Sequence, residues 1–382
     1  MNVKENTKKL AVRFFICLVC ISPLLIHAVE QIPVLGLQEV FRIEDTGVDF
    51  FFKSPSSPVV DKEGFIFVDD QKQLLMFSPS GKYLRNFYTE GQGPFEMTGI
   101  NGIWPGKDQL VFSNQNPHKL IWFDRNGNPL KETRIRNEVG YTPFLTYFDG
   151  RFYYLDEEFF DTKNKAVYVD IPVRLLSVNP AEDNFKVEPV SFPKKYFVMN
   201  TNWIMNVYFV QTAVYNDNSV FIAYDGNYKI SRLDLKTMSL TPWFKQSYEK
   251  VAIKDEWKKI LKPSRFPHYG PSGKEYRVFE RKALDDVQRI WINGDKIWVI
   301  TSTFDESTRR VQVDVFDSTA KKKGSMRLSM PGGFHLFTMS HNPMTLHEEK
   351  LYIFEASEDG VYSLVCYRLL NVPDWAKSTL SK

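Results

Sequence analysis

The stretch EGFIFVDDQKQLLMFSPSGKYLRNFY, residues 63–88, contains the pattern that decides the fold. A polar turn leads into the apolar run FIFV, which suits a central strand buried on both faces. A second run, LLMF, and a third, KYLRNFY, follow it and are separated by the turn SPSG. Strands separated by turns rich in Asp, Asn, Pro, Gly or Ser are typical of antiparallel hairpins. With the short strand SSPVVD upstream, the stretch predicts one four-stranded sheet.

The same order of turn, buried run and hairpin recurs along the chain. The buried runs begin at residues 65, 110, 152, 220, 297 and 351. Four antiparallel strands repeated six times predict an all-β chain folded as a six-bladed β-propeller. The first two spacings match the roughly 40 to 50 residues of a blade, and the longer spacings indicate insertions. Two stacked β-sandwiches would not give the same order six times, whereas five or seven blades remain the alternatives.

The two ends of the repeat region complement each other. After VYSLVCYRLL, residues 361–370, the chain continues as NVPDWAKSTLSK and has no convincing outer strand for the last blade. GLQEVFRI, residues 36–43, is strand-like and has no blade of its own. An unpaired strand edge is a liability that ring closure removes. We therefore expect residues 37–43 to pair as the outer strand of the blade that contains residues 351–355.

The segment TEGQGPFEM, residues 89–97, raises the question of a phosphate-binding loop, because its glycines have G-x-G spacing. A Walker loop would continue to Gly-Lys-Ser/Thr, and a dinucleotide-binding loop would have a third glycine where Glu96 stands. Pro94 also removes a backbone N–H group that an anion site would use. The segment is therefore predicted to be a structural connection between the first two blades.

This segment resembles a G-x-G-P-G-E-F motif of bacterial secreted six-bladed propellers related to the NHL-repeat family. The matching residues are Gly91, Gly93, Pro94 and Glu96, while Phe95 and Met97 depart from the motif. As architecture, the resemblance covers residues from about 36 to 370. It implies the fold and a binding face, and it implies no defined reaction because the family is functionally mixed.

The first thirty residues have a different composition from the rest. A basic head containing Lys8 and Arg13 precedes the apolar run of residues 14–26, which is too short to span a bilayer. This pattern predicts a secretory signal peptide over residues 1–28, cleaved after Ala28, with an uncleaved anchor as the alternative. Residues 29–382 would then be a single propeller domain, exported to the periplasm or the medium, without a transmembrane segment.

Charge and cysteine content narrow the possible functions further. The whole net charge of +3 lies in the predicted signal peptide, which leaves the mature chain near zero, so nucleic acid is not an expected partner. Cys366 is the only cysteine after residue 28, and its alternating apolar surroundings predict a buried hydrophobic side chain rather than a nucleophile. His335, His341 and His347 recur every six residues, but Pro343 interrupts them and the turn around His347 predicts a solvated ring, which disfavours a metal site.

A calcium site is the alternative cofactor prediction. Some six-bladed propellers, the gluconolactonase-like hydrolases, hold calcium in the central channel through Glu, Asn and Asp. Polar residues that follow the buried runs could converge on such a cation, or they could cap and solvate the strand ends, which is the favoured interpretation. The candidate ligands are Asp70, Asn114, Asp156, Asp225 and Glu355.

Long connections are predicted on one face of the ring. Connections between blades share a face with the loops between second and third strands, whereas tight turns such as SPSG, RNGN and NGDK lie on the other face. The predicted long segments are residues 91–97, 136–142, 156–170, 191–206, 247–284 and 302–309. The largest of them, between blades 4 and 5, contains VAIKDEWKKILK, residues 251–262, whose apolar stripe predicts a small helix that serves either as a lid or as rim packing.

Function concentrates in loops displayed by a rigid scaffold, so we expect a ligand over the channel on this face. Aromatic area with polar tips favours recognition. The candidate ligand-binding residues are Trp203, Trp257, Arg265, His268 and Tyr269. The leading hypothesis is an exported, non-enzymatic propeller without a cofactor that binds an unidentified ligand or partner protein. The alternatives are a calcium-assisted hydrolase or lyase and a structural module of an envelope assembly.

Overall fold

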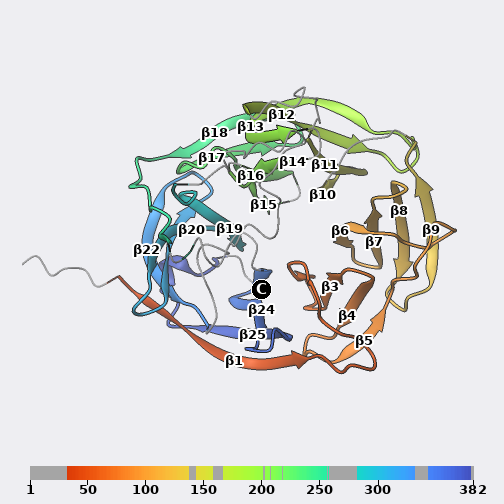
Figure 1. The fold of residues 1–382 in the computed structure, drawn as a ribbon, viewed down its shortest axis with the longest axis horizontal. Coiled ribbons are helices and arrows are strands. Elements are labelled where there is room, and N and C mark those ends of the chain that lie inside the picture. The colour runs from red at the N-terminus through yellow and green to blue at the C-terminus, as the bar shows by residue number, and fades with distance from the viewer. Residues whose placement is uncertain are drawn as a thin grey trace, which may run out of the picture.

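The computed structural model describes residues 32–136, 143–157, 167–200, 203–206, 208–216, 218–255, 257, 282–331 and 343–379. Six blades of antiparallel strands stand side by side around a central axis and form a ring, and β1 joins the last two blades into one eight-stranded sheet (Figure 1). In each blade the first strand lies nearest the axis and the fourth lies outermost (Figure 1). The predicted six-bladed propeller is therefore confirmed.

The blades follow one another in chain order. Blade 1 contains β2 (Val59–Val60), β3 (Ile66–Asp70), β4 (Gln73–Phe77) and β5 (Tyr83–Asn86). Blade 2 contains β6 (Ile100–Pro105), β7 (Gln109–Asn114), β8 (Lys119–Asp124) and β9 (Pro129–Arg134). Blade 3 contains β10 (Phe144–Phe148), β11 (Arg151–Glu157), β12 (Val167–Val178), β13 (Lys186–Asn200) and a fifth strand, β14 (Trp203–Asn206).

The second half of the ring is built in the same way. Blade 4 contains β15 (Gln211–Tyr215), β16 (Ser219–Ala223), β17 (Lys229–Asp234) and β18 (Ser239–Lys245). Blade 5 contains β19 (Val287–Asn293), β20 (Lys296–Asp305), β21 (Arg310–Asp317) and β22 (Lys322–Ser329). Blade 6 contains β23 (Met344–His347), β24 (Lys350–Ala356), β25 (Tyr362–Leu370) and β1 (Val34–Glu44), and a short 3-10 helix, η3 (Asp374–Ala376), follows it.

The six predicted buried runs are the second strands of the blades, and their position explains their composition. Phe67 of β3 packs in the cluster that contains Phe112 of blade 2, whereas the neighbouring Val68 packs in the cluster that contains Phe354 of blade 6. Successive side chains of a strand point to opposite faces, so a strand between two neighbouring blades is apolar on both. The apolar cores therefore lie between the blades.

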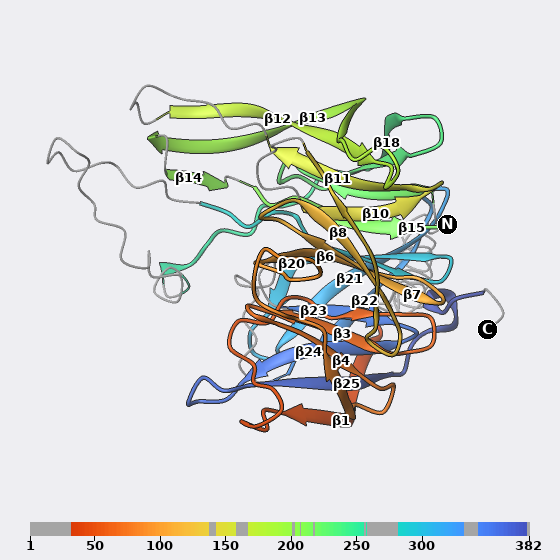
Figure 2. The ribbon, with the colours of Figure 1, turned by 90° about the vertical axis from the view of Figure 1, so that its right-hand side faces the viewer.

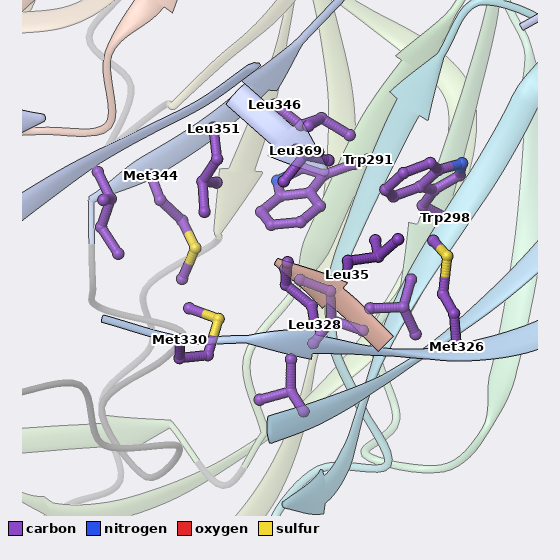
Figure 3. Packing of buried hydrophobic residues seen from close by; sticks show 14 of the residues in the cluster. Leu35, Trp291, Trp298, Met326, Leu328, Met330, Met344, Leu346, Leu351 and Leu369 are labelled. Carbon is purple, nitrogen blue, oxygen red and sulfur yellow. The ribbon is translucent and has the colours of Figure 1, made fainter. Parts of the chain in front are cut away.

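The ring closes through the N-terminal strand, as predicted. β1 pairs antiparallel with β25, from Gly36 opposite Leu370 to Glu44 opposite Ser363. Its first residues also pair in parallel with β22 of blade 5, where Leu35 lies opposite Leu328. The Leu35 side chain is fully buried in the cluster between blades 5 and 6 (Figure 3). One strand thus completes blade 6 and joins it to blade 5.

Two segments predicted to be long connections are wholly or partly strand. Residues 191–206 continue β13 and then form β14, and residues 302–305 are the end of β20. In β12, residues 173–178 pair with β11, whereas residues 167–172 pair only with β13. The end of blade 3 is therefore a three-stranded extension of β12, β13 and β14 that runs past β11 (Figure 2).

Other expectations fall partly or wholly outside the described residues. The signal peptide lies there entirely, as does most of the helix predicted at 251–262. No helix in the described part of the chain has the length and apolar character needed to cross a membrane. Cys366 is fully buried, as predicted, and burial raises the pKa of its thiol.

Candidate functional site

The two faces of the ring carry different connections. The turns between first and second strands and between third and fourth strands are short, and this side is the narrow-turn face. The loops between second and third strands and the connections between blades leave the other side, the loop-rich face. The connection from β18 to β19 is the longest of those between consecutive strands, and it leaves the loop-rich face, as does the extension of blade 3 (Figure 2).

The long connection between blades 4 and 5 begins and ends as a short paired stem. Ala252 bridges Ala283, and Leu284 N–H donates to the Val251 carbonyl at 2.9 Å. Beyond this stem, Trp257 is buried in the apolar cluster between blades 5 and 6, and its Nε1 donates to Glu306 Oε1 at 2.8 Å. The stem is therefore fixed to blade 5 of the propeller.

Lys254 strengthens the same anchor. Its Nζ lies 2.5 Å from Glu306 Oε2 and 5.0 Å from the centre of the Trp257 ring. Glu306 belongs to the connection between β20 and β21, so one loop of the propeller holds two side chains of the insertion. The described ends of the insertion are thereby held at blade 5.

Two consecutive acidic residues, Asp285 and Asp286, hold the chain just before β19 to its neighbours. Asp286 Oδ2 accepts a hydrogen bond from Tyr228 N–H at 2.9 Å, and its Oδ1 lies 2.9 Å from Lys250 Nζ. Asp285 Oδ2 accepts one from Phe209 N–H at 3.1 Å. Burial raises the pKa of Asp286, and the Lys250 ammonium opposes this effect. The pair thus ties the connections around blade 4 to the start of blade 5, a role that no sequence motif indicated.

The extension of blade 3 is held by a charge cluster at its base. Lys194 is almost fully buried and forms an ion pair with Glu157, while its Nζ lies 4.8 Å from the centre of the Tyr196 ring. Burial and the nearby Glu157 carboxylate raise the pKa of Tyr196. Tyr168, further along the extension, is 58% exposed. The base of the blade 3 extension is thus held by the Lys194–Glu157 pair, and the Tyr168 side chain is exposed to solvent further along the extension.

The predicted ligand-binding residues that the structure describes lie in different parts of it. Trp203 begins β14, where it lies opposite Asn200 of β13. Trp257 has an exposed fraction of 9% and is part of the anchor described above. Arg265, His268 and Tyr269 lie outside the described residues. Trp257 therefore positions the insertion rather than offering its ring as a contact surface.

The five candidate calcium ligands are engaged within the protein. Asp70 accepts hydrogen bonds from Lys53 and Ser54 N–H at 2.7 and 2.8 Å. Asn114 Oδ1 accepts them from Thr98 and Gly99 N–H at 2.8 and 3.2 Å. In both blades a side chain at the end of the second strand therefore fastens the connection that enters the first strand.

The other three candidates face cations of their own blade. Asp156 pairs with Arg174, Asp225 Oδ2 lies 3.6 Å from Lys229 Nζ, and Glu355 Oε2 lies 3.0 Å from Arg42 Nη2. Across the described residues, no three His, Cys, Asp or Glu side chains come together in a way that could hold a metal ion. This donor set does not fit a shared calcium ion, because its oxygens already accept protein donors.

The predicted solvation of His347 is corrected by the structure, while the other two histidines lie outside the described residues. His347 ends β23 and is half-buried, and this burial lowers the pKa of its imidazole.

The glycine-containing segment is a structural connection, as predicted. Gly93 N–H donates to Glu96 Oε2 at 2.8 Å, and Phe95 N–H donates to Glu132 Oε2 at 2.6 Å. Lys119, which is fully buried, donates to the Gly93 carbonyl at 2.8 Å and pairs with Glu132 at 3.1 Å. These backbone N–H groups bind carboxylates of the protein, so they do not form a phosphate cradle.

Sequence reasoning missed a cavity of about 220 Å³ between blades 2 and 3. It lies near the narrow-turn face, and its lining includes Trp104, Trp122 and Tyr147. Clustered aromatic residues near the ends of β6, β8 and β10 were a visible signal, but their convergence depends on how two blades pack.

Comparisons with known proteins agree with this architecture. One similar solved structure is a member of the DUF4221 family from Bacteroides vulgatus, with 10% identity, a TM-score of 0.55, and coverage of 88% of this chain and 99% of that one. Another is a protein inferred to be exported from Bacteroides fragilis, with 12% identity, a TM-score of 0.49 and coverage of 88% and 96%. The first of these similarities shows a shared fold and, at 10% identity, the fold alone.

The sequence comparisons give a family. No curated protein matches the chain. A family model described as a 6-bladed beta-propeller matches residues 37–239, which is more than half of the chain and includes the closing strand β1. The chain therefore belongs to the DUF5128 family of six-bladed β-propellers.

Proposed function

We propose that this protein is an exported propeller that binds a ligand or partner protein on its loop-rich face, without catalysing a reaction. The observation that carries the proposal is that both large additions to the ring leave this one face. These additions are the insertion between β18 and β19 and the three-stranded extension of blade 3 (Figure 2). Loops and extensions displayed by a rigid scaffold are where binding residues concentrate.

The anchoring of both additions supports a binding role. The Trp257–Glu306 contact fixes the stem of the insertion, and the Lys194–Glu157 pair fixes the base of the extension. A surface that is held in place before binding loses less conformational entropy when a partner arrives. Export is supported by the basic head and apolar run of residues 1–28.

Site-specific photocrosslinking in the producing cells tests which face binds. A photoreactive amino acid is placed at Tyr168 and Val361, which are exposed on the loop-rich face, and at Asn126 and Lys236 on the narrow-turn face. We expect discrete crosslinked adducts from the first two positions only. Adducts confined to Asn126 and Lys236 would place the partner on the other face and refute the proposal.

Once the bound molecule is identified, substitutions in the insertion test the contact residues. His268→Ala and Tyr269→Ala are expected to weaken binding by on the order of 1 kcal/mol each, whereas Asn126→Ala is expected to leave it unchanged.

The N-terminal sequence of the exported protein is expected to begin at Val29. One calcium ion per purified chain, together with hydrolase or lyase activity that a chelator abolishes, would replace the binding role with an enzymatic one.

A further inference from the structure

The cavity between blades 2 and 3 has aromatic walls and one cationic rim. Its lining residues are Trp104, Gln109, Trp122, Leu130, Lys131, Tyr147, Phe152 and Pro180. The ring centres of Trp104 and Tyr147 are 4.5 Å apart at an angle of 46°, and Trp122 meets Phe152 edge-on at 6.1 Å. Side chains from six strands of two blades, together with Pro180 in the turn after β12, thus surround one opening near the narrow-turn face.

The Pro180 carbonyl at the edge of the cavity accepts a hydrogen bond from a smaller side chain than the corresponding carbonyl between blades 4 and 5. There the fifth residue of the outer strand β18 is Trp243, and its Nε1 donates to the Ser318 carbonyl in the next blade at 3.0 Å. The fifth residue of β9 is Thr133, whose Oγ1 donates to the corresponding carbonyl, Pro180 O, at 3.3 Å. A hydroxyl therefore contacts the carbonyl at the edge of this cavity, whereas an indole contacts the corresponding carbonyl between blades 4 and 5.

The charge around the cavity is one-sided. Lys131 lies opposite Trp122 in the β8–β9 pair, and its Nζ is held 5.0 Å from the centre of the Trp122 ring. Within the described part of the chain, no carboxylate forms an ion pair with Lys131, and no Asp or Glu lines the cavity. Gln109 adds an amide that can both donate and accept. A ligand with a negative charge at the rim would therefore meet a cation and no opposing anion.

Size and shape restrict the ligand further. A volume of about 220 Å³ is below the roughly 300–1,000 Å³ of pockets for drug-sized molecules, so it suits one planar ring system with a short substituent. Tilted aromatic walls favour an aromatic ring, because offset and edge-on ring contacts are the preferred geometries.

We propose that the cavity between blades 2 and 3 is a binding site for a small aromatic carboxylate, with the ring between Trp104, Trp122 and Tyr147 and the carboxylate at Lys131. This site is on the opposite side of the ring from the surface assigned to the partner above, so the two proposals stand independently. The cavity would give the propeller a second, small-molecule ligand.

Calorimetric titration of the full chain with small probes tests the site. The probes are benzoate and indoleacetate, with the neutral analogues benzyl alcohol and tryptophol and the cationic analogue tryptamine. We expect saturable binding of at least one carboxylate, about tenfold weaker binding of its neutral analogue, and no binding of tryptamine. Failure of both carboxylates to bind, or equal affinity for a carboxylate and its neutral analogue, would overturn the proposal.

Two variants assign the binding to this cavity. Lys131→Gln removes the exposed ammonium and is expected to weaken carboxylate binding about five- to tenfold, without weakening binding of the neutral analogue. Thr133→Trp replaces the hydroxyl that contacts the cavity-lining Pro180 by an indole, and it is expected to abolish binding of every probe. The control is Lys236→Gln, an exposed lysine in the turn before β18, which is expected to bind like the parent.

Thermal unfolding of each variant confirms that it is folded. If Thr133→Trp does not fold, the Lys131→Gln comparison still decides the proposal. Carboxylate binding that is unchanged in folded Lys131→Gln would place the ligand elsewhere and overturn the assignment.

Discussion

Replacing Gly91 by alanine is expected to destabilise the propeller through one identified contact. Gly91 has a φ of +149°, and a Cβ built on it would lie 1.9 Å from Glu96 Oε2. That carboxylate accepts the Gly93 N–H at 2.8 Å and cannot move away without breaking this bond. The alanine would therefore add backbone strain and also displace Glu96.

The magnitude follows from two contributions. Strain at an unfavourable backbone conformation costs about 1–3 kcal/mol, and a lost hydrogen bond to a charged group costs about 1.5–3 kcal/mol. We expect Gly91→Ala to lower the free energy of unfolding by about 3 kcal/mol. Gly150→Ala is the matched control, because Gly150 also has a positive φ, of +76°, but nothing lies within 4 Å of its Cβ position. It is expected to cost about 1 kcal/mol.

Urea unfolding followed by circular dichroism measures these values, and a double-mutant cycle isolates the contact. Glu96→Ala alone is expected to cost about 1.5 kcal/mol. In that background Gly91→Ala should cost only the strain, so the two changes together cost about 1.5 kcal/mol less than their sum. Strict additivity, or an equal cost for Gly91→Ala and Gly150→Ala, would refute the contact between Gly91 and Glu96 as the cause.

Three further predictions follow from the other contacts. Burial and the neighbouring Asp70 raise the pKa of Asp69 to about 7 from an ordinary value of 3.8, so the folded state holds a proton that the unfolded chain has released. Stability should therefore fall as pH rises from about 4 to 7, by about 2 kcal/mol after allowance for partial exposure, and Asp69→Asn should remove this slope in urea unfolding at several pH values. Leu35→Asp places a charge in the core between blades 5 and 6 and is expected to lower the melting temperature by more than 5 °C, with Val40→Asp on the exposed side of β1 as the near-neutral control. Glu306→Gln weakens the anchor of the insertion and is expected to speed hydrogen exchange at Trp257 at least tenfold without changing exchange in blades 1 and 2; uniform acceleration would contradict a local anchor.

The fold could be predicted from the sequence because its information is local and repeated. A second strand such as β3 is apolar on both faces, since Phe67 and Val68 each face another blade. The closing strand could be predicted because a strand was missing at one end of the repeats and spare at the other. Each of these signals can be read within a few consecutive residues.

The site was harder to predict because its contacts join distant residues. The segment containing Lys194 was interpreted as a loop, but Lys194 is buried in a strand next to Glu157, 37 positions away. Trp257 has the composition of a recognition residue, but its polar atom is bound by Glu306, 49 positions away. The aromatic cavity depends on side chains of blade 2, such as Trp104 and Trp122, meeting Tyr147 of blade 3. Such contacts appear only after the blades are packed.

The pairing of β1 with β25 has a consequence for the order of folding. Because the chain is synthesised from its N-terminus, β1 is among the first strands to be made, yet its partner is among the last; the ion pair between Arg42 and Glu355 alone spans 313 positions. Blades 1 to 4 can form from local hairpins, whereas closure is a long-range step that must wait for nearly the whole chain. Until then the outer edge of β25 and both edges of β1 remain open to other strands. A partly synthesised or C-terminally truncated chain would therefore keep unpaired strand edges and be prone to aggregation. Only a chain that includes β25 can bury these edges by closing the ring.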